Sequence, residues 1–306
     1  MRVAVVDIGT NSTRLLIAEV SDGRVSQQLA RSSHVTRLGA GVDQDGRLNE
    51  DAIQRVCDTL ERYEREIERH DAEERIAVLT SAVRDAANGA EFAATVQSRY
   101  GLDPRVLAGE EEARLTFLGA TSERDPSDST PTVVIDVGGG STELVIGSAQ
   151  QPGFHVSTQA GVVRQTERHL HEDPPTAAQL DELSNDVRAI LAGGVPVEQR
   201  TAVSRAIAVA GTATSLAAIA QALEPYDPEK VHGYRLTGRQ CEQMLAELAS
   251  LPLDQRRAVP GLHPDRAPTI IAGVVILLLA LALFELHEVE VSEHDILRGA
   301  ALALSS

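Results

Sequence analysis

The chain has 306 residues, of which 42% are hydrophobic, and a formal net charge of -17 at pH 7. This amount of apolar material supports a sizeable core and is enough for two domains of ordinary size. The negative charge repels nucleic acid and anionic membrane surfaces at long range, which argues against a DNA- or RNA-binding protein and against a membrane-surface protein. A phosphate-rich ligand would therefore have to be met by a local basic cluster.

Cysteine content and hydropathy narrow the class further. The two cysteines, Cys57 and Cys241, both fall in helix-like patterns and support neither a disulfide framework nor a cysteine metal site. The amino terminus runs directly into a strand pattern without the features of a signal peptide. The uniformly apolar segment 270–284 is shorter than the ~20 residues that a membrane span needs. We expect a cytoplasmic protein in which this segment forms a helix that is buried all round.

The amino-terminal half begins with an apolar run, an aspartate, a small-residue turn and a second apolar run, which predicts a β-hairpin. A further strand is expected around 24–38, and Asn49 is the expected cap of an amphipathic helix through about residue 70. Segment 75–80 is predicted to be a buried strand, and 89–99 and 110–119 are predicted to be helices. The Ser-, Asp- and Pro-rich stretch 121–131 has no apolar periodicity and marks the expected domain boundary.

The carboxyl-terminal half opens with the same hairpin pattern. Residues 136–146 align without a gap on residues 7–17, so each copy places an aspartate at a strand end beside a tight turn. Helices are predicted near 162–171 and 176–191, and a strand at 206–210 leads into the small-residue segment 211–215. Strands that alternate with helices in both halves predict an α/β architecture with a cleft between the halves.

The two repeated turns are the expected phosphate-binding loops. Glycines leave backbone amides open to an anion, and hydroxyl groups add further donors. The second loop consists of Gly138, Gly139, Gly140 and Ser141, and Asn11 and Ser12 occupy the corresponding turn of the first copy. A plain hairpin turn would account for either loop alone, but it does not explain why the aspartate-headed loop occurs twice.

A carboxylate beside a phosphate needs a cation between the two groups. Asp136 and Glu143 lie on either side of the second turn, where a hairpin would bring them to one magnesium ion, with Asp7 nearby. The alternative for Glu143 is a solvated strand residue, because Arg14 takes its place in the first copy.

Three further side chains are candidates for chemistry. Acidic residues in the first turn of a helix are usually explained by the helix dipole, but Glu112 also suits a carboxylate that orients and deprotonates an attacking water. Arg84 follows a buried strand, and Arg266 precedes the apolar segment. Taken alone, each arginine is more readily explained as a surface charge.

Six segments together resemble motifs of the exopolyphosphatase/guanosine pentaphosphate phosphatase family, in order along nearly the whole chain. They read DIGTNS from residue 7, TSAVRDA from 80, GEEEAR from 109, DVGGGSTEL from 136, GTAT from 211 and VHGYRL from 231. The resemblance implies two ribonuclease-H-like domains of the actin-like ATPase superfamily around an active-site cleft. It places the first domain at 1–125 plus about 298–306, where a final helix returns to it, and the second domain at 126–297.

The resemblance implies an exopolyphosphatase, which hydrolyses the terminal phosphoryl group of inorganic polyphosphate and releases orthophosphate. Larger members carry a carboxyl-terminal helical domain that extends the polyphosphate-binding surface; we expect this chain to be a short form without it and to act on short polyphosphate chains. By the family pattern, Glu112 is the catalytic base, and Asp136 and Glu143 bind Mg²⁺ or another divalent cation such as Mn²⁺. The phosphate contacts would come from Asn11, Ser12, Arg84, Gly138, Gly139, Gly140, Ser141 and Arg266.

Three other activities remain open at this point. The same groups would serve a guanosine pentaphosphate 5′-phosphohydrolase. An ATP-dependent kinase or ATPase would bind ATP through segment 211–215. A non-catalytic regulator would bind polyphosphate or alarmone, although such a protein would not need Glu112 beside a metal-binding pair. The family resemblance also leads us to expect a homodimer.

Overall fold

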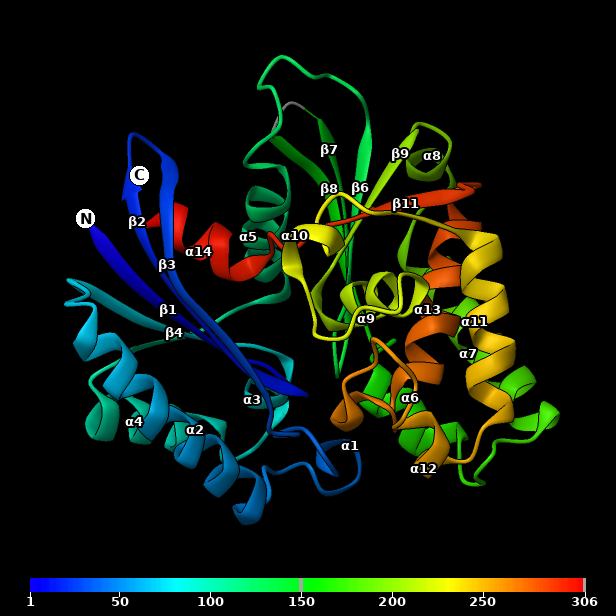
Figure 1. Cartoon of the computed structure of the whole chain (residues 1–306), viewed down its shortest axis with the longest axis horizontal. Coiled ribbons are helices and arrows are strands. Elements are labelled where there is room, and N and C mark those ends of the chain that lie inside the picture. The colour runs from blue at the N-terminus through cyan, green and yellow to red at the C-terminus, as the bar shows by residue number, and fades with distance from the viewer. Residues whose placement is uncertain (149–150, 305–306) are drawn as a thin grey trace. The chain divides into compact units, whose positions relative to one another are not determined.

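The computed structural model describes residues 1–148 and 151–304, and the chain divides into two compact units (Figure 1). Unit 1 comprises Met1–Ser122 with His294–Ser306, and unit 2 comprises Glu123–Glu293. Each unit contains one mixed sheet and its helices, which confirms the predicted α/β class.

Unit 1 has a five-stranded sheet in the order β3-β2-β1-β4-β5. Strand β1 pairs antiparallel with β2 and parallel with β4, so a meander is followed by parallel strands. This is the ribonuclease-H-like order that the family resemblance predicts. The elements are β1 (Arg2–Ile8), β2 (Ser12–Ser21), β3 (Arg24–Val35), α1 (Val42–Asp45), α2 (Glu50–Arg69), β4 (Glu74–Leu79), α3 (Ser81–Asp85), α4 (Gly89–Tyr100), β5 (Asp103–Val106), α5 (Gly109–Thr121) and α14 (Ile296–Ala303).

The central strand β1 of unit 1 is buried on both faces of the sheet, and its side chains alternate between two cores. Ala4, Val6 and Ile8 belong to the core that includes α2 and α4, whereas Val3 and Val5 belong to the core that includes α14. Figure 1 shows the red ribbon of α14 beside α5. The predicted start of α2 is confirmed, since the Asn49 side chain accepts a hydrogen bond from the Asp51 amide at 2.8 Å.

Unit 2 has a six-stranded sheet in the order β10-β11-β9-β6-β7-β8. Strand β6 pairs antiparallel with β7 and parallel with β9, so the unit repeats the topology of unit 1 with one added edge strand. The elements are β6 (Thr132–Val137), β7 (Thr142–Ser148), β8 (Gln151–Thr158), α6 (Val162–His169), α7 (Ala177–Gly194), α8 (Val197–Arg200), β9 (Arg205–Val209), α9 (Ala210–Ala220), α10 (Pro228–Val231), β10 (Arg235–Thr237), α11 (Gly238–Ser250), α12 (Leu253–Arg256), η1 (Pro264–Arg266), α13 (Ile270–Leu283) and β11 (Glu288–Val291).

Helix α13 corrects one prediction. It is buried from Ile270 to Leu277, but Leu279 and Leu283 are partly exposed and Ala282 is exposed. The expectation of a helix buried all round was therefore wrong for its carboxyl-terminal half, because the rest of unit 2 covers only part of that half. Among the described residues, none of the helices combines the length and the apolar character that crossing a membrane requires.

Candidate active site

The first repeated loop joins β1 to β2 and is closed by a hydrogen bond from the Gly9 amide to the Ser12 carbonyl, 3.0 Å long. Within residues 1–148 and 151–304, the amides of Thr10 and Asn11 have no acceptor. The Asn11 side-chain oxygen is buried and also lacks a partner there. Buried polar groups are normally paired, so the loop presents polar atoms for a bound ligand.

The second repeated loop joins β6 to β7 and has the same closing bond, 2.9 Å from the Gly138 amide to the Ser141 carbonyl. The carbonyls of Gly138 and Gly139 accept hydrogen bonds from the first turn of α6, at 2.9 and 2.8 Å. In the described part of the chain, the amides of Gly139, Gly140 and Ser141 donate to no acceptor. Successive unpaired amides in a turn form an anion-binding concavity.

Asp136 and Glu143 stand directly opposite each other on β6 and β7, and both are buried. Directly opposed residues share one face of an antiparallel pair, which brings the two carboxylates side by side. The Ser157 hydroxyl donates to Glu143 Oε1 at 2.8 Å. Two neighbouring carboxylates repel each other. Their oxygen donors match the ligands that magnesium prefers, so this pair fits a hard divalent cation.

In the first copy of the hairpin, the residue opposite the aspartate is an arginine, whose positive charge offsets that of the carboxylate. Arg14 is opposite Asp7, and its Nε atom donates to Asp7 Oδ2 at 2.8 Å. Burial raises the pKa of Asp7 above its usual value, and Arg14 offsets only part of this effect. The other oxygen, Oδ1, is buried and has no partner among the described residues. Asp7 is thus paired with Arg14 within its own unit through one of its two oxygens.

Asp295 is a further buried carboxylate on the same arginine. It pairs with Arg14 and, at 3.3 Å, with Arg31, and it accepts the Leu297 amide at the start of α14. Burial acts to raise the pKa of Asp295, but the two guanidinium groups and the amide outweigh it, so this pKa lies below its usual value. Sequence reasoning missed this group, because its two arginine partners are more than 260 residues away along the chain.

Glu112 and Arg84 were singled out separately, and the structure brings them together. Arg84 Nη1 donates to Glu112 Oε2 at 3.1 Å and to the Leu107 carbonyl at 2.9 Å. A 2.9 Å hydrogen bond between the hydroxyls of Thr10 and Ser81 joins the first loop to α3, which carries Arg84. Asn11, Ser12, Arg84 and Glu112 are called the unit 1 set below.

Arg266 lies in unit 2 and contacts the first two turns of α9. Its Nη1 atom donates to the Ser215 hydroxyl at 3.1 Å and to the Gly211 carbonyl. A Cβ atom on Gly211 would lie 2.6 Å from Nη1, so a larger residue here would displace the Arg266 guanidinium. The same Nη1 atom lies 3.5 Å from the Thr214 hydroxyl, which is also on α9. The unit 2 set consists of Asp136, Gly138, Gly139, Gly140, Ser141, Glu143 and Arg266.

Known proteins share this arrangement over the full chain. Residues 16–302 match the model of the Ppx/GppA phosphatase family. Exopolyphosphatase 2 of Mycobacterium tuberculosis is 38% identical over 316 aligned residues, which cover 99% of this chain and 98% of the relative.

Two crystal structures agree with this match. A Ppx/GppA family member of Aquifex aeolicus has a TM-score of 0.82 at 32% identity and covers 100% of this chain and 97% of that one. An exopolyphosphatase of Cytophaga hutchinsonii has a TM-score of 0.88 at 27% identity, with 99% and 97% covered. The family resemblance read from the sequence is confirmed. The chain is a phosphatase, a hydrolase with the two-domain actin-like fold, and it belongs to the Ppx/GppA phosphatase family.

Proposed function

We propose that the protein is an exopolyphosphatase that removes the terminal phosphoryl group of short inorganic polyphosphate and releases orthophosphate. The observation that carries the proposal is the buried Asp136–Glu143 pair beside a loop with three unpaired amides. The name of the mycobacterial relative supports polyphosphate as the substrate.

In this proposal, both sets act on one phosphoryl group. The amides of residues 139–141 and of Thr10 and Asn11 bind its oxygens, and Arg84 and Arg266 balance their charge. Asp136 and Glu143 would hold Mg²⁺, or another divalent cation such as Mn²⁺, whose charge offsets that of the phosphate oxygens.

The proposed domains are those expected from the sequence, 1–125 with about 298–306, and 126–297.

Glu112 is the proposed general base. It orients a water in line with the terminal phosphorus and accepts a proton from it as the new P–O bond forms. The bond to the bridging oxygen breaks, and the shortened polyphosphate leaves as a weak base that requires no general acid. Positioning and electrostatic stabilisation supply most of the catalysis in such reactions.

The test is a comparison of Glu112→Gln with Glu111→Gln. Glu111 lies in the same helical turn, but it is only partly buried and pairs with Arg114 at 2.9 Å, so it serves as a matched control. Glu112→Gln should reduce kcat by about 10²- to 10⁴-fold while the protein still binds polyphosphate, and Glu111→Gln should remain near wild type. Near-native turnover of Glu112→Gln would rule out this role for Glu112.

We further propose that the enzyme works in the cytoplasm as a homodimer. Light scattering after gel filtration would give the mass of the particle, and a mass of one chain would contradict the dimer. Guanosine pentaphosphate remains the competing substrate because the same groups would cleave its terminal phosphate. It is therefore assayed in parallel with polyphosphate.

A further inference from the structure

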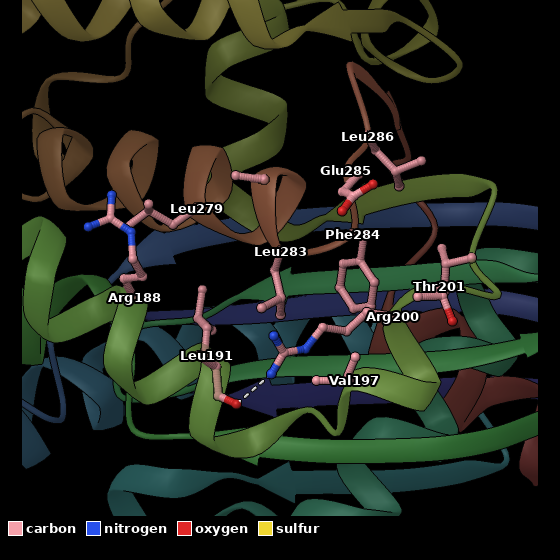
Figure 2. A pocket seen from close by; sticks show the side chains of 13 residues that line it. Arg188, Leu191, Val197, Arg200, Thr201, Leu279, Leu283, Phe284, Glu285 and Leu286 are labelled. Atoms are coloured by element: carbon pink, nitrogen blue, oxygen red, sulfur yellow. Dashed lines mark hydrogen bonds between the residues drawn. The ribbon is translucent and has the colours of Figure 1, made fainter.

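Unit 2 contains a pocket of about 660 Å³ at the carboxyl-terminal end of α13 (Figure 2). Its walls come from the end of α7, from α8 and from the segment that follows α13. The apolar lining includes Leu191, Val197, Leu279, Leu283, Phe284 and Leu286. Small-molecule sites typically measure about 300–1,000 Å³ and are mostly apolar, so both size and lining suit a small organic ligand.

The apolar surface in this pocket is unusual for a helix that is partly exposed at the surface of a protein. A helix at the surface normally carries polar residues on its solvent side. Helix α13 has none between Ile270 and Leu283, although Leu279, Ala282 and Leu283 are not fully buried. Across the pocket, Val197 is 62% exposed. Exposed apolar surface that gathers in one hollow marks a binding site more often than scattered exposed residues do.

Two arginines give the pocket its charge. Arg200 donates to the carbonyls of Ala192 and Val195, at 2.7 and 2.9 Å, and Arg188 donates to the Asn185 side chain at 3.2 Å. Neither guanidinium pairs with a carboxylate among the residues that the structure describes. Glu285 is the one acidic residue in the lining, so the lining carries a net positive charge in a chain of net charge -17.

We propose that this pocket binds an anionic amphiphile, a small molecule with an apolar body and one sulfonate, carboxylate or phosphate group. The apolar body would pack on the leucines of α13, and the anion would pair with Arg188. The residues of α13 that line the pocket are Leu279, Ala282 and Leu283, so the pocket lies roughly 14–20 Å along the helix axis from the end that follows Arg266. It is therefore separate from the unit 2 set, and the proposal does not depend on the proposed function.

The probe is 8-anilinonaphthalene-1-sulfonate, which combines aromatic rings with one sulfonate. Fluorescence titration of the full-length folded protein should show saturable binding of one probe per chain. In Ala282→Trp the indole ring should occupy the space of the probe. We expect the Kd of the probe to rise at least about tenfold. Ala178→Trp is the matched control, because Ala178 is exposed in the first turn of α7, outside the pocket lining, and should leave the Kd unchanged.

A second comparison isolates the charge. Arg188→Glu should weaken binding of the sulfonate probe by roughly tenfold or more, because a charge-assisted hydrogen bond is lost. The uncharged analogue N-phenyl-1-naphthylamine should bind this variant and the wild type equally. Near-ultraviolet circular dichroism verifies that each variant is folded.

Three results would overturn the proposal. One is the absence of saturable binding, and another is unchanged sulfonate binding in Ala282→Trp or in Arg188→Glu. The third is a change of oligomeric mass in Ala282→Trp, which would identify the pocket as a contact between copies of this chain.

Discussion

The two copies of the hairpin differ in the residue opposite the aspartate, and this one difference decides which copy suits a metal ion. Asp136 faces Glu143 in the second copy, whereas Asp7 faces Arg14 in the first. In the first copy, the positive charge beside the aspartate comes from the Arg14 guanidinium, whereas in the second copy it would come from a bound cation. Only the second copy therefore retains a pair of opposed acidic side chains that suits a metal ion.

Arg14 should be essential for stability. Arg14→Met would leave Asp7 and Asp295 buried without their shared guanidinium, and breaking such a buried pair costs about 3–5 kcal/mol. Urea denaturation should show this loss, and the double variant Arg14→Met/Asp7→Asn should recover part of it. A loss below about 1 kcal/mol in the single variant would mean that the pair is not formed in solution.

At the scale of elements, helices α5 and α14 connect the proposed base to the carboxyl-terminal segment. A Cβ atom on Gly299 would lie 1.8 Å from the Leu115 carbonyl, and one on Gly119 would lie 2.0 Å from the Asp295 carbonyl. The two backbones therefore touch, and α5 also carries Glu112. Any displacement of α14 would change the position of Glu112.

Gly299→Ala should force these helices apart and destabilise the protein by about 1–3 kcal/mol, as other overpacked sites do. Gly193→Ala is the control, because a Cβ atom there meets nothing within 4 Å. Alanine also has the better helix propensity, so the control should be neutral or slightly stabilising. Equal thermal midpoints for the two variants would contradict the close packing of α5 and α14.

The start of α14 should be sensitive to acid through Asp295. The folded-state pKa of this carboxyl lies below its usual value, so its stabilising contribution is present above the unfolded pKa of about 3.9. It is lost as the pH falls through the lower, folded-state pKa. The difference in unfolding free energy between wild type and Asp295→Asn should therefore be largest near neutral pH and should shrink below about pH 4. A difference that stays constant from pH 3 to pH 7 would refute this contribution.

At the scale of the whole molecule, the duplicated topology was accessible from the sequence, because the repeat 7–17 and 136–146 is local and ungapped. The cap at Asn49 and the strand before Arg84 were predictable for the same reason. The Arg14–Asp295 contact spans 281 residues and leaves no local pattern. The partial exposure of α13 depends on what its neighbours cover, which hydropathy alone does not report.

The most direct measurement of function is phosphate release from short-chain polyphosphate with and without Mg²⁺, with guanosine pentaphosphate and ATP assayed on the same preparation. We predict fast release from polyphosphate that depends on Mg²⁺, and slow release from ATP. Preferential release from guanosine pentaphosphate, or no release from polyphosphate in the presence of Mg²⁺, would contradict the assignment as an exopolyphosphatase.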